Sequence, residues 1–156
     1  MLDDEERRRL ESAYRDFGGE VWRAIHAYAG GRRDVADEAV AEAFAQAGRR
    51  IEHIRSLRPW VFRAAFRIAA AELARGRHAA PLTELGDARE LEDGSGDILD
   101  LLESLSPRQR RVFLLREILG FSTMESADLL GSSVVSVRVH LHAARRRLRE
   151  SLSEGI

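Results

Sequence analysis

The chain has 156 residues, a formal net charge of −1 and no cysteine, and all 25 of its basic residues are arginine. The absence of cysteine excludes disulfides, thiolate zinc sites and cysteine nucleophiles. The first residues are charged rather than apolar, and no apolar run approaches the ~18 residues needed to cross a bilayer. These features predict a cytoplasmic protein without a signal peptide or a membrane span.

Charge is unevenly distributed along the chain. Residues 1–79 contain 15 Arg and 13 acids, residues 80–104 one Arg and eight acids, and residues 105–156 nine Arg and five acids. Two mildly basic blocks therefore flank an acidic segment. Arginine is suited to bidentate contacts with phosphate and guanine, although a GC-rich genome would produce the same preference for arginine over lysine.

The first part of the chain carries helical periodicity with two glycine interruptions. The pattern predicts a charged helix over about residues 4–17 and a break at Gly18–Gly19. Helical spacing resumes from Val21 to Tyr28 and ends at Gly30–Gly31. We therefore expect two short helical segments here.

Two further helices complete the predicted amino-terminal domain. Apolar residues from Val35 to Ala47 indicate an amphipathic helix with one consistent face. Pro59 fits the first turn of the next helix, whose apolar residues extend to Leu73. The sequence thus predicts a compact, alanine-rich helical domain over residues 1–78.

The helical pattern fails between the two basic blocks. Residues 79–97 contain Pro81, several glycines and a majority of acids among their charged residues. Such a composition does not supply enough apolar surface for a packed core. We therefore expect an acidic, flexible linker over residues 79–97.

Helicity resumes in residues 98–156. Ser106, Pro107 and Gln109 form a capping-box pattern with proline at the first helical position. Apolar residues then continue from Val112 to Leu119. The predicted fold class is all-α, with two small helical domains joined by the linker and a carboxy-terminal bundle of about four helices.

Residues 122–149 read as two helices joined by a tight turn. Ser122 and Glu125 form a second capping box, Gly131 suits a left-handed turn, and Ser133 is placed to cap the second helix. The apolar residues of that second helix form one stripe: Val137, Leu141, Ala144 and Leu148. This pattern is typical of a helix-turn-helix motif, whose second helix enters the major groove of DNA.

The opposite face of that second helix carries the candidate DNA contacts. Arg138 is suited to guanine O6 and N7, and Val135 and Val139 to thymine methyl groups. The full set of candidates for the groove is Val134, Val135, Ser136, Arg138, Val139 and His142, with Arg145, Arg146, Arg147 and Arg149 as phosphate contacts. The alternative for the arginine run is a solvated helix end whose charges complement the helix dipole.

A second group of candidates lies in the amino-terminal domain. Arg63 and Arg67 are four residues apart on one helical face, and Trp60 and Phe62 lie close by. Cations that follow the backbone together with rings that stack on bases suit single-stranded DNA. The alternative for Trp60 is an ordinary core residue behind Pro59.

The chain resembles a bacterial sigma factor of the extracytoplasmic-function family over nearly its whole length. Leu105–Pro107 with Arg110–Arg116 resembles the opening of the family's fourth region, and Leu129–Gly131, Ser136–Arg138 and Ala144–Leu148 resemble its recognition helix and tail. Ala36–Glu38 with Val40, Glu42 and Phe44 resembles the second-region segment that docks on polymerase. Trp60–Arg63 with Ala65 resembles the segment that melts the minus-ten promoter element.

This resemblance implies further roles and partners. It makes Asp37, Glu38, Glu42 and Phe44 the candidate polymerase-binding residues. It implies that an acidic linker strand, with Asp87, Glu90, Glu92 and Asp93, threads a polymerase channel. The implied partners are core RNA polymerase and promoter DNA, and an anti-sigma protein is left open as a third.

Several positions depart from the family's pattern. Val35 and Ala41 replace an Asp and a Gln of the docking helix, and Arg67 and Ala71 replace an Asn and an Asp after the tryptophan segment. In the helix-turn-helix, Ser126 replaces an Ile, Ser132 an apolar residue, and His140 an Arg. These departures indicate a divergent member of the family. The resemblance therefore does not predict which promoter sequence it recognises.

The sequence offers no constellation for catalysis. The five histidines are scattered, and the glycine pairs lie between helices with no strand before them. We therefore expect no enzyme activity, cofactor, metal or small-molecule substrate. Two alternatives to a sigma factor stay open: a helix-turn-helix regulator that does not act as a sigma subunit, and a divergent sigma-like protein that needs a partner.

Overall fold

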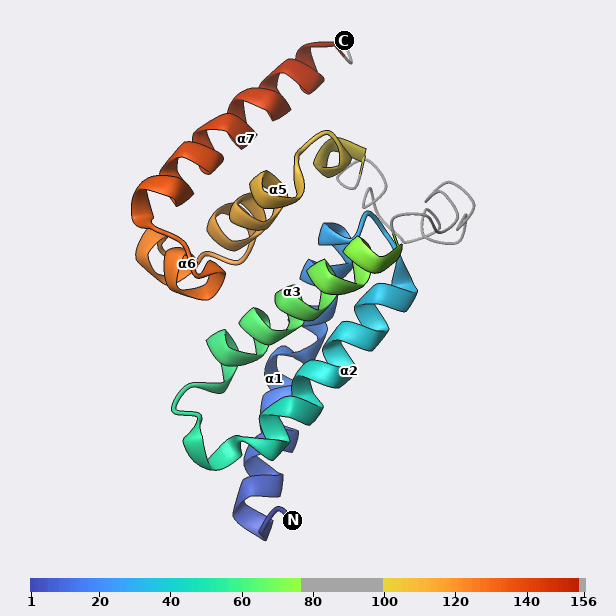
Figure 1. Ribbon diagram of the computed structural model, residues 1–156, viewed down its shortest axis with the longest axis vertical. Helices are drawn as coiled ribbons and strands as arrows, with labels where there is room; N and C mark the ends of the chain where they lie inside the picture. Colours follow the sequence, from blue (N-terminus) through green and yellow to red (C-terminus); the bar gives the residue numbers. More distant parts are fainter. Residues whose placement is uncertain (77–99, 155–156) are drawn as a thin grey trace. The chain divides into compact units, whose positions relative to one another are not determined.

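The computed structural model describes residues 1–76 and 100–154, and every regular element in these two ranges is a helix (Figure 1). The chain divides into two compact units, Met1–Pro81 and Leu82–Ile156. The predicted linker over residues 79–97, with the acids expected to thread a polymerase channel, lies outside the described residues. The all-α prediction is confirmed.

The amino-terminal unit opens with one long helix, α1 (Asp4–Tyr28). Asp3 caps it: its carboxylate accepts a 2.8 Å hydrogen bond from the backbone N–H of Glu6, and the Glu6 side chain accepts a 3.0 Å bond from the backbone N–H of Asp3. This reciprocal pair satisfies two of the backbone donors that every helix start leaves free.

The predicted break at Gly18–Gly19 is wrong, because α1 runs through both residues. Gly18 is buried, and a Cβ atom there would lie 3.2 Å from the Tyr14 ring. Each glycine in a helix interior costs roughly 0.5–1 kcal/mol relative to alanine. Packing of the helix against the rest of the unit offsets that cost.

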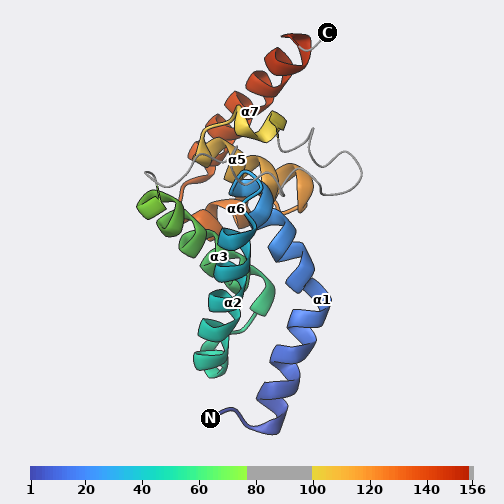
Figure 2. The ribbon, with the colours of Figure 1, turned by 90° about the vertical axis from the view of Figure 1, so that its right-hand side faces the viewer.

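Two more helices pack on α1, namely α2 (Arg33–Arg49) and α3 (Leu57–Arg75), joined by the short 3₁₀ turn η1 (Ile51–His53). Figures 1 and 2 show the three long helices alongside one another. The predicted apolar face of α2 is confirmed, since its buried residues are Val35, Ala36, Ala39, Val40, Ala43, Phe44 and Ala47. The four alanines in that face let neighbouring helices approach closely.

The carboxy-terminal unit continues from a helical segment at residues 100–103. Helix α5 (Pro107–Phe113) begins at the predicted capping box of Ser106 and Gln109 and passes into a π-helical turn, η5 (Leu114–Ile118). Helix α6 (Thr123–Leu130) and the long α7 (Val134–Glu154) follow. Figure 1 shows α6 at the base of α7.

The helix-turn-helix prediction is confirmed in its local geometry. Ser122 caps α6 with the reciprocal partner Glu125, and Gly131 adopts the left-handed conformation at φ 61°. The Ser133 hydroxyl accepts a 3.0 Å hydrogen bond from the backbone N–H of Ser136 and so caps α7. Three members of the predicted stripe on α7 are buried, namely Val137, Leu141 and Ala144, whereas Leu148 is half-buried.

The buried Ser126 places a hydroxyl group in the core of the carboxy-terminal unit. The residue is fully buried, and its hydroxyl has no hydrogen-bond partner among residues 1–76 and 100–154. An unsatisfied buried polar group costs roughly 1–3 kcal/mol. We therefore expect Ser126→Ala to raise the free energy of unfolding of the carboxy-terminal unit by about 1 kcal/mol, measured by urea titration of the full chain with circular dichroism.

The matched control is Ser122→Ala, which removes the α6 cap and should lower stability by about 1 kcal/mol. The two substitutions delete the same hydroxyl group from positions four residues apart. A Ser126→Ala chain that is less stable than the parent would show that its hydroxyl has a partner in solution.

Candidate nucleic-acid interface

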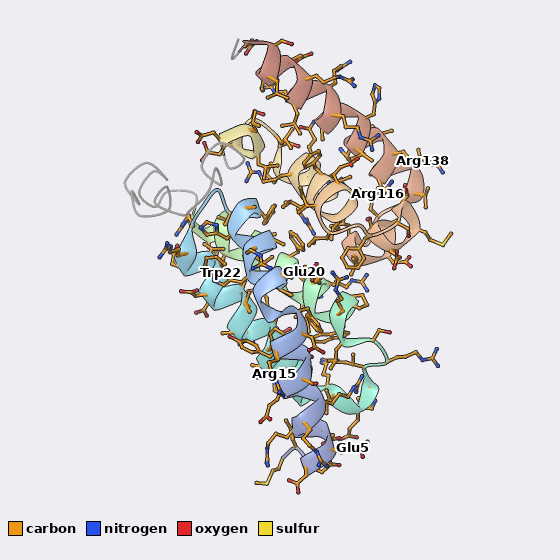
Figure 3. The ribbon with its side chains drawn as sticks, turned by 180° about the vertical axis from the view of Figure 1, so that it is seen from behind. Glu5, Arg15, Glu20, Trp22, Arg116 and Arg138 are labelled. Atoms are coloured by element: carbon orange, nitrogen blue, oxygen red, sulfur yellow. The ribbon has the colours of Figure 1, made fainter. Side chains whose placement is uncertain are left out.

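The first half of α7 presents an exposed face of mixed apolar and basic character. Val135 and Val139 are 69% and 59% exposed, and Arg138 projects from the helix into solvent (Figure 3). His142, Arg146 and Arg149 are also exposed. Valines that are this exposed leave their methyl groups free for contact with thymine methyls. The predicted groove-contacting face therefore exists as a surface.

Two members of the predicted upstream set have other roles. Val134 is half-buried and packs against the core cluster of the helix-turn-helix, so only part of its side chain faces the solvent. Arg145 forms an ion pair with Glu117, to whose carboxylate its Nε also donates at 2.9 Å. That contact ties α7 to η5. The predicted phosphate contact at Arg145 would therefore require exchange of this ion pair for one with DNA.

The other candidate contacts on α7, which are Ser136 and four arginines, differ in their surroundings. The Nε of Arg147 donates a 3.2 Å hydrogen bond to the carbonyl of Ser104, which anchors α7 to the start of the unit. Ser136 is half-buried, and its backbone N–H is bonded to the cap. Arg138, Arg146 and Arg149 are exposed on α7, so they stay the best candidates on this face.

A small basic pocket beside the turn was not anticipated from the sequence. It has a volume of about 120 Å³ and is lined by Arg108 and Arg111 of α5, by Gly131 and Ser132 of the turn, by His140 of α7, and by Val112 and Leu130. Arginine and histidine side chains at this position can hold a DNA phosphate. Their spacing along the chain gave no signal, because α5 and α7 are about 30 residues apart.

The amino-terminal unit contains a larger basic groove of about 650 Å³. Trp60, Arg63 and Arg67 line it from α3, so the structure brings together three of the four residues predicted to contact single-stranded DNA. Sequence reasoning missed the opposite wall, which Gln46, Arg49 and Arg50 supply from the end of α2. The Arg49–Arg50 pair at a helix end was the only available signal.

Phe62 is the exception among these predicted residues. It is 0% exposed and lies in the core, with the Arg58 guanidinium 5.2 Å from its ring centroid. Two residues along a helix correspond to a rotation of about 200°, so Phe62 and Trp60 point to different sides of α3. The prediction that Phe62 stacks on DNA bases is therefore wrong.

Three of the four predicted polymerase-binding residues lie on one side of α2. Asp37 and Glu38 are exposed and Glu42 is half-exposed. Phe44 is only 8% exposed: the Tyr14 ring meets it edge-on at 5.1 Å and Phe17 stacks on it at 5.9 Å. Its predicted contact with polymerase is wrong, because neighbouring rings of α1 cover it.

Asp37 is held in place from α1. The indole N–H of Trp22 donates a 2.8 Å hydrogen bond to the Asp37 carboxylate, and the Trp22 ring stacks on His26 with 4.7 Å between centroids. Burial and the nearby Arg33 charge lower the pKa of His26, so its imidazole is neutral near pH 7. Trp22 therefore fixes the orientation of the Asp37 carboxylate.

Glu42 carries two interactions of its own. Its carboxylate accepts hydrogen bonds from the Gln46 amide at 3.1 Å and from the Arg49 guanidinium at 3.0 Å. These bonds from Gln46 and Arg49 lower the pKa of Glu42. The carboxylate is therefore charged at neutral pH. An ion pair with a basic group of a partner requires this charge.

Neither a metal site nor a membrane span emerges in the described part of the chain. Residues 1–76 and 100–154 contain no group of three metal-ligating side chains. No helix within those ranges is long and apolar enough to cross a bilayer.

A known family model matches part of the carboxy-terminal unit. Residues 95–148 match the family model of sigma-70 region 4. Over 72 residues the chain is 40% identical to the RNA polymerase sigma-E factor of Streptomyces coelicolor, an alignment that covers 46% of this chain and 41% of that protein. Over 48 residues it is 48% identical to the ECF RNA polymerase sigma factor SigG of Mycobacterium tuberculosis, covering 31% and 13%. Residues 95–148 therefore match sigma-70 region 4, and the chain is similar over part of its length to extracytoplasmic-function sigma factors.

Two solved structures share the fold of this chain. The structure of CnrH in complex with the cytosolic domain of CnrY has a TM-score of 0.74 and 24% identity, covering 95% of this chain and 90% of that one. The sigma factor RpoE from Bartonella quintana, solved with the anti-sigma factor NepR, has a TM-score of 0.66 and 23% identity, covering 88% and 97%. The chain spans less than half the length of the curated relatives it matches.

The structure places several of the departures from the sigma-factor pattern. Val35 is 1% exposed and belongs to the core, whereas Ala41 is exposed on the same side of α2 as Asp37, Glu38 and Glu42. His140 and Ser132 line the small pocket beside the turn. The departures at Ala41 and His140 therefore lie at the surface, and the one at Val35 lies in the core.

Proposed function

We propose that this protein is a sigma factor that binds core RNA polymerase and confers promoter recognition for transcription initiation. The observation that carries the proposal is the region 4 helix-turn-helix with its exposed Val135, Arg138 and Val139. A helix with this surface reads base edges in the major groove. The site of action is the cytoplasm, and the function needs no catalytic residue, cofactor or metal.

The carboxy-terminal unit reads the upstream promoter element. Arg138 donates to guanine, and the two exposed valines contact thymine methyls. His142 lies beside them, and Arg146 and Arg149 hold phosphates farther along α7. Arg108, Arg111 and His140 hold a further phosphate in the pocket at the turn. Phosphate contacts fix the register of the helix, and the base contacts supply the sequence preference.

The amino-terminal unit captures the opened strand of the downstream element. The groove between α2 and α3 combines four arginines with the half-buried ring of Trp60. Arginines follow the phosphate backbone of a single strand, and an aromatic ring stacks on an unpaired base. Binding the extruded bases offsets the unstacking cost of a few kcal/mol without any chemical step.

The exposed acids of α2 dock on polymerase. Asp37, Glu38 and Glu42 present negative charge to basic residues of the partner, and the exposed Ala41 between them lets a partner helix approach closely. An anti-sigma protein is a further proposed partner, since the structurally similar Bartonella quintana factor was solved with one. We retain the domain limits 1–78, 79–97 and 98–156 as part of this proposal.

Binding to core polymerase separates this function from its main alternative. We expect one copy of the protein to co-elute with purified core polymerase in size-exclusion chromatography. A helix-turn-helix regulator that does not act as a sigma subunit would bind promoter DNA but would not form this complex. Transcription from the reconstituted enzyme then separates an autonomous sigma factor from one that needs a partner.

Trp60→Ala tests the strand-capture groove. We expect the substitution to leave binding to closed duplex promoter unchanged and to lower open-complex formation about tenfold, since stacking contributes roughly 1–3 kcal/mol per base. Permanganate footprinting of unpaired thymines measures the open complex. Trp60→Phe is the matched control, because it retains an aromatic ring and should retain most of the activity. Global unfolding of the alanine variant would instead identify Trp60 as a core residue.

A further inference from the structure

One acid of α2 connects the two surfaces that the proposed function assigns to polymerase and to DNA. The Glu42 carboxylate binds Gln46 at 3.1 Å and Arg49 at 3.0 Å. Both donors line the basic groove of about 650 Å³, where Trp60 and Arg63 stand on the opposite wall. Glu42 itself lies among the docking acids.

The spacing of Glu42, Gln46 and Arg49 along α2 explains how the two surfaces are connected. Positions 42, 46 and 49 are four and three residues apart, so they form one row along the surface of α2. The row begins at the docking acids and ends in the groove. The side chains of Glu42 and Arg49 are 42% and 63% exposed, so both can exchange partners without unpacking the core.

We propose that Glu42 is a positioning residue that controls whether Arg49 and Gln46 are available to DNA. In the free protein, Glu42 holds both groups and neutralises one groove cation. When a basic residue of polymerase pairs with Glu42, Arg49 is released to contact the phosphate backbone of the captured strand. This inference rests on the proposed function, because it links the two binding surfaces named there.

Coupling of this kind is reciprocal. If polymerase binding at Glu42 raises the affinity of the groove for single-stranded DNA, the captured strand raises the affinity for polymerase by the same factor. Exposed ion pairs are weak, so the expected factor is small, about two- to fivefold. The arrangement favours DNA capture by the holoenzyme over capture by the free protein.

A double-mutant cycle on the full chain tests the coupling without polymerase. The measurement is the affinity for a fluorescently labelled single-stranded oligonucleotide of mixed sequence, at low salt, by anisotropy. We expect Glu42→Gln to bind about two- to fivefold more tightly than the parent, because Arg49 is freed. We expect this gain to vanish in the Arg49→Gln background.

Two controls separate this mechanism from general charge effects. Glu11→Gln removes the same charge from an exposed position on α1 and should leave the affinity unchanged. A Glu42→Gln gain that persists in the Arg49→Gln background would overturn the proposal, as would the absence of any gain.

Arg63→Gln separates failure of the inference from failure of the proposed function. If Arg63→Gln weakens oligonucleotide binding while the Glu42 effect is absent, the groove binds DNA and only the coupling is wrong. If Arg63→Gln has no effect, the groove is not the site of strand capture, and the coupling and that part of the proposed function both fall.

Discussion

Phe62→Ala is expected to lower the free energy of unfolding of the amino-terminal unit by about 3–5 kcal/mol. Phe62 is fully buried in α3, so removing its ring leaves a cavity as well as a loss of apolar burial. Both tryptophans of the chain, Trp22 and Trp60, lie in this unit, so their fluorescence during urea unfolding reports its stability.

The neighbouring Arg63→Ala serves as the control for that substitution. Arg63 is exposed and lines the basic groove, so its replacement should change stability by less than ~0.5 kcal/mol while weakening single-strand binding. Normal stability of Phe62→Ala together with a loss of promoter melting would contradict the burial of Phe62 and restore it as a DNA contact.

Arg138→Ala is expected to weaken promoter binding by the holoenzyme by about 1–3 kcal/mol and to relax the sequence preference at one position of the upstream element. Arg138 is exposed on the same face of α7 as the exposed Val135 and Val139. Competition binding over a set of upstream-element variants, each changed at one base pair, measures both effects together.

Arg149→Ala provides the contrast with a phosphate contact. We expect it to weaken binding to every sequence equally and to reduce the dependence of log affinity on log salt concentration by about one. If Arg138→Ala behaves in the same uniform way, Arg138 holds a phosphate and the assignment of base readout on α7 is wrong.

The parts of the fold that depend on local interactions were predictable from sequence. The caps at Ser106 and Ser122 and the left-handed Gly131 involve residues within three or four positions of one another, so their signals are visible in the chain itself. The buried stripe of α7 follows in the same way from helical periodicity.

The parts of the fold that depend on packing between distant segments were not predictable from sequence. Gly18 breaks a helix by propensity, yet the packed unit keeps α1 intact. Phe44 and Phe62 are suitable aromatic contacts by residue type, but neighbouring helices bury both. The pairing of Arg145 with Glu117 spans 28 positions and leaves no trace in local spacing.

The same division between local and long-range interactions applies to the candidate DNA-binding residues. The exposed face of α7 that carries Arg138 depends on the periodicity of a single helix, so its exposure was predictable from sequence. The groove needs two helices: sequence reasoning found Trp60, Arg63 and Arg67 on α3 but not Arg49 and Arg50 on the facing end of α2. Complementary walls of a groove become visible only when the tertiary arrangement is known.

Run-off transcription with purified core RNA polymerase tests the sigma-factor function most directly. The templates are fragments of genomic DNA from the source bacterium, transcribed with and without the protein. We expect discrete new transcripts that depend on the protein and disappear when Arg138 is replaced by alanine. Absence of such transcripts, while the protein still binds DNA, would contradict an autonomous sigma factor and favour a regulator or a factor that needs a partner.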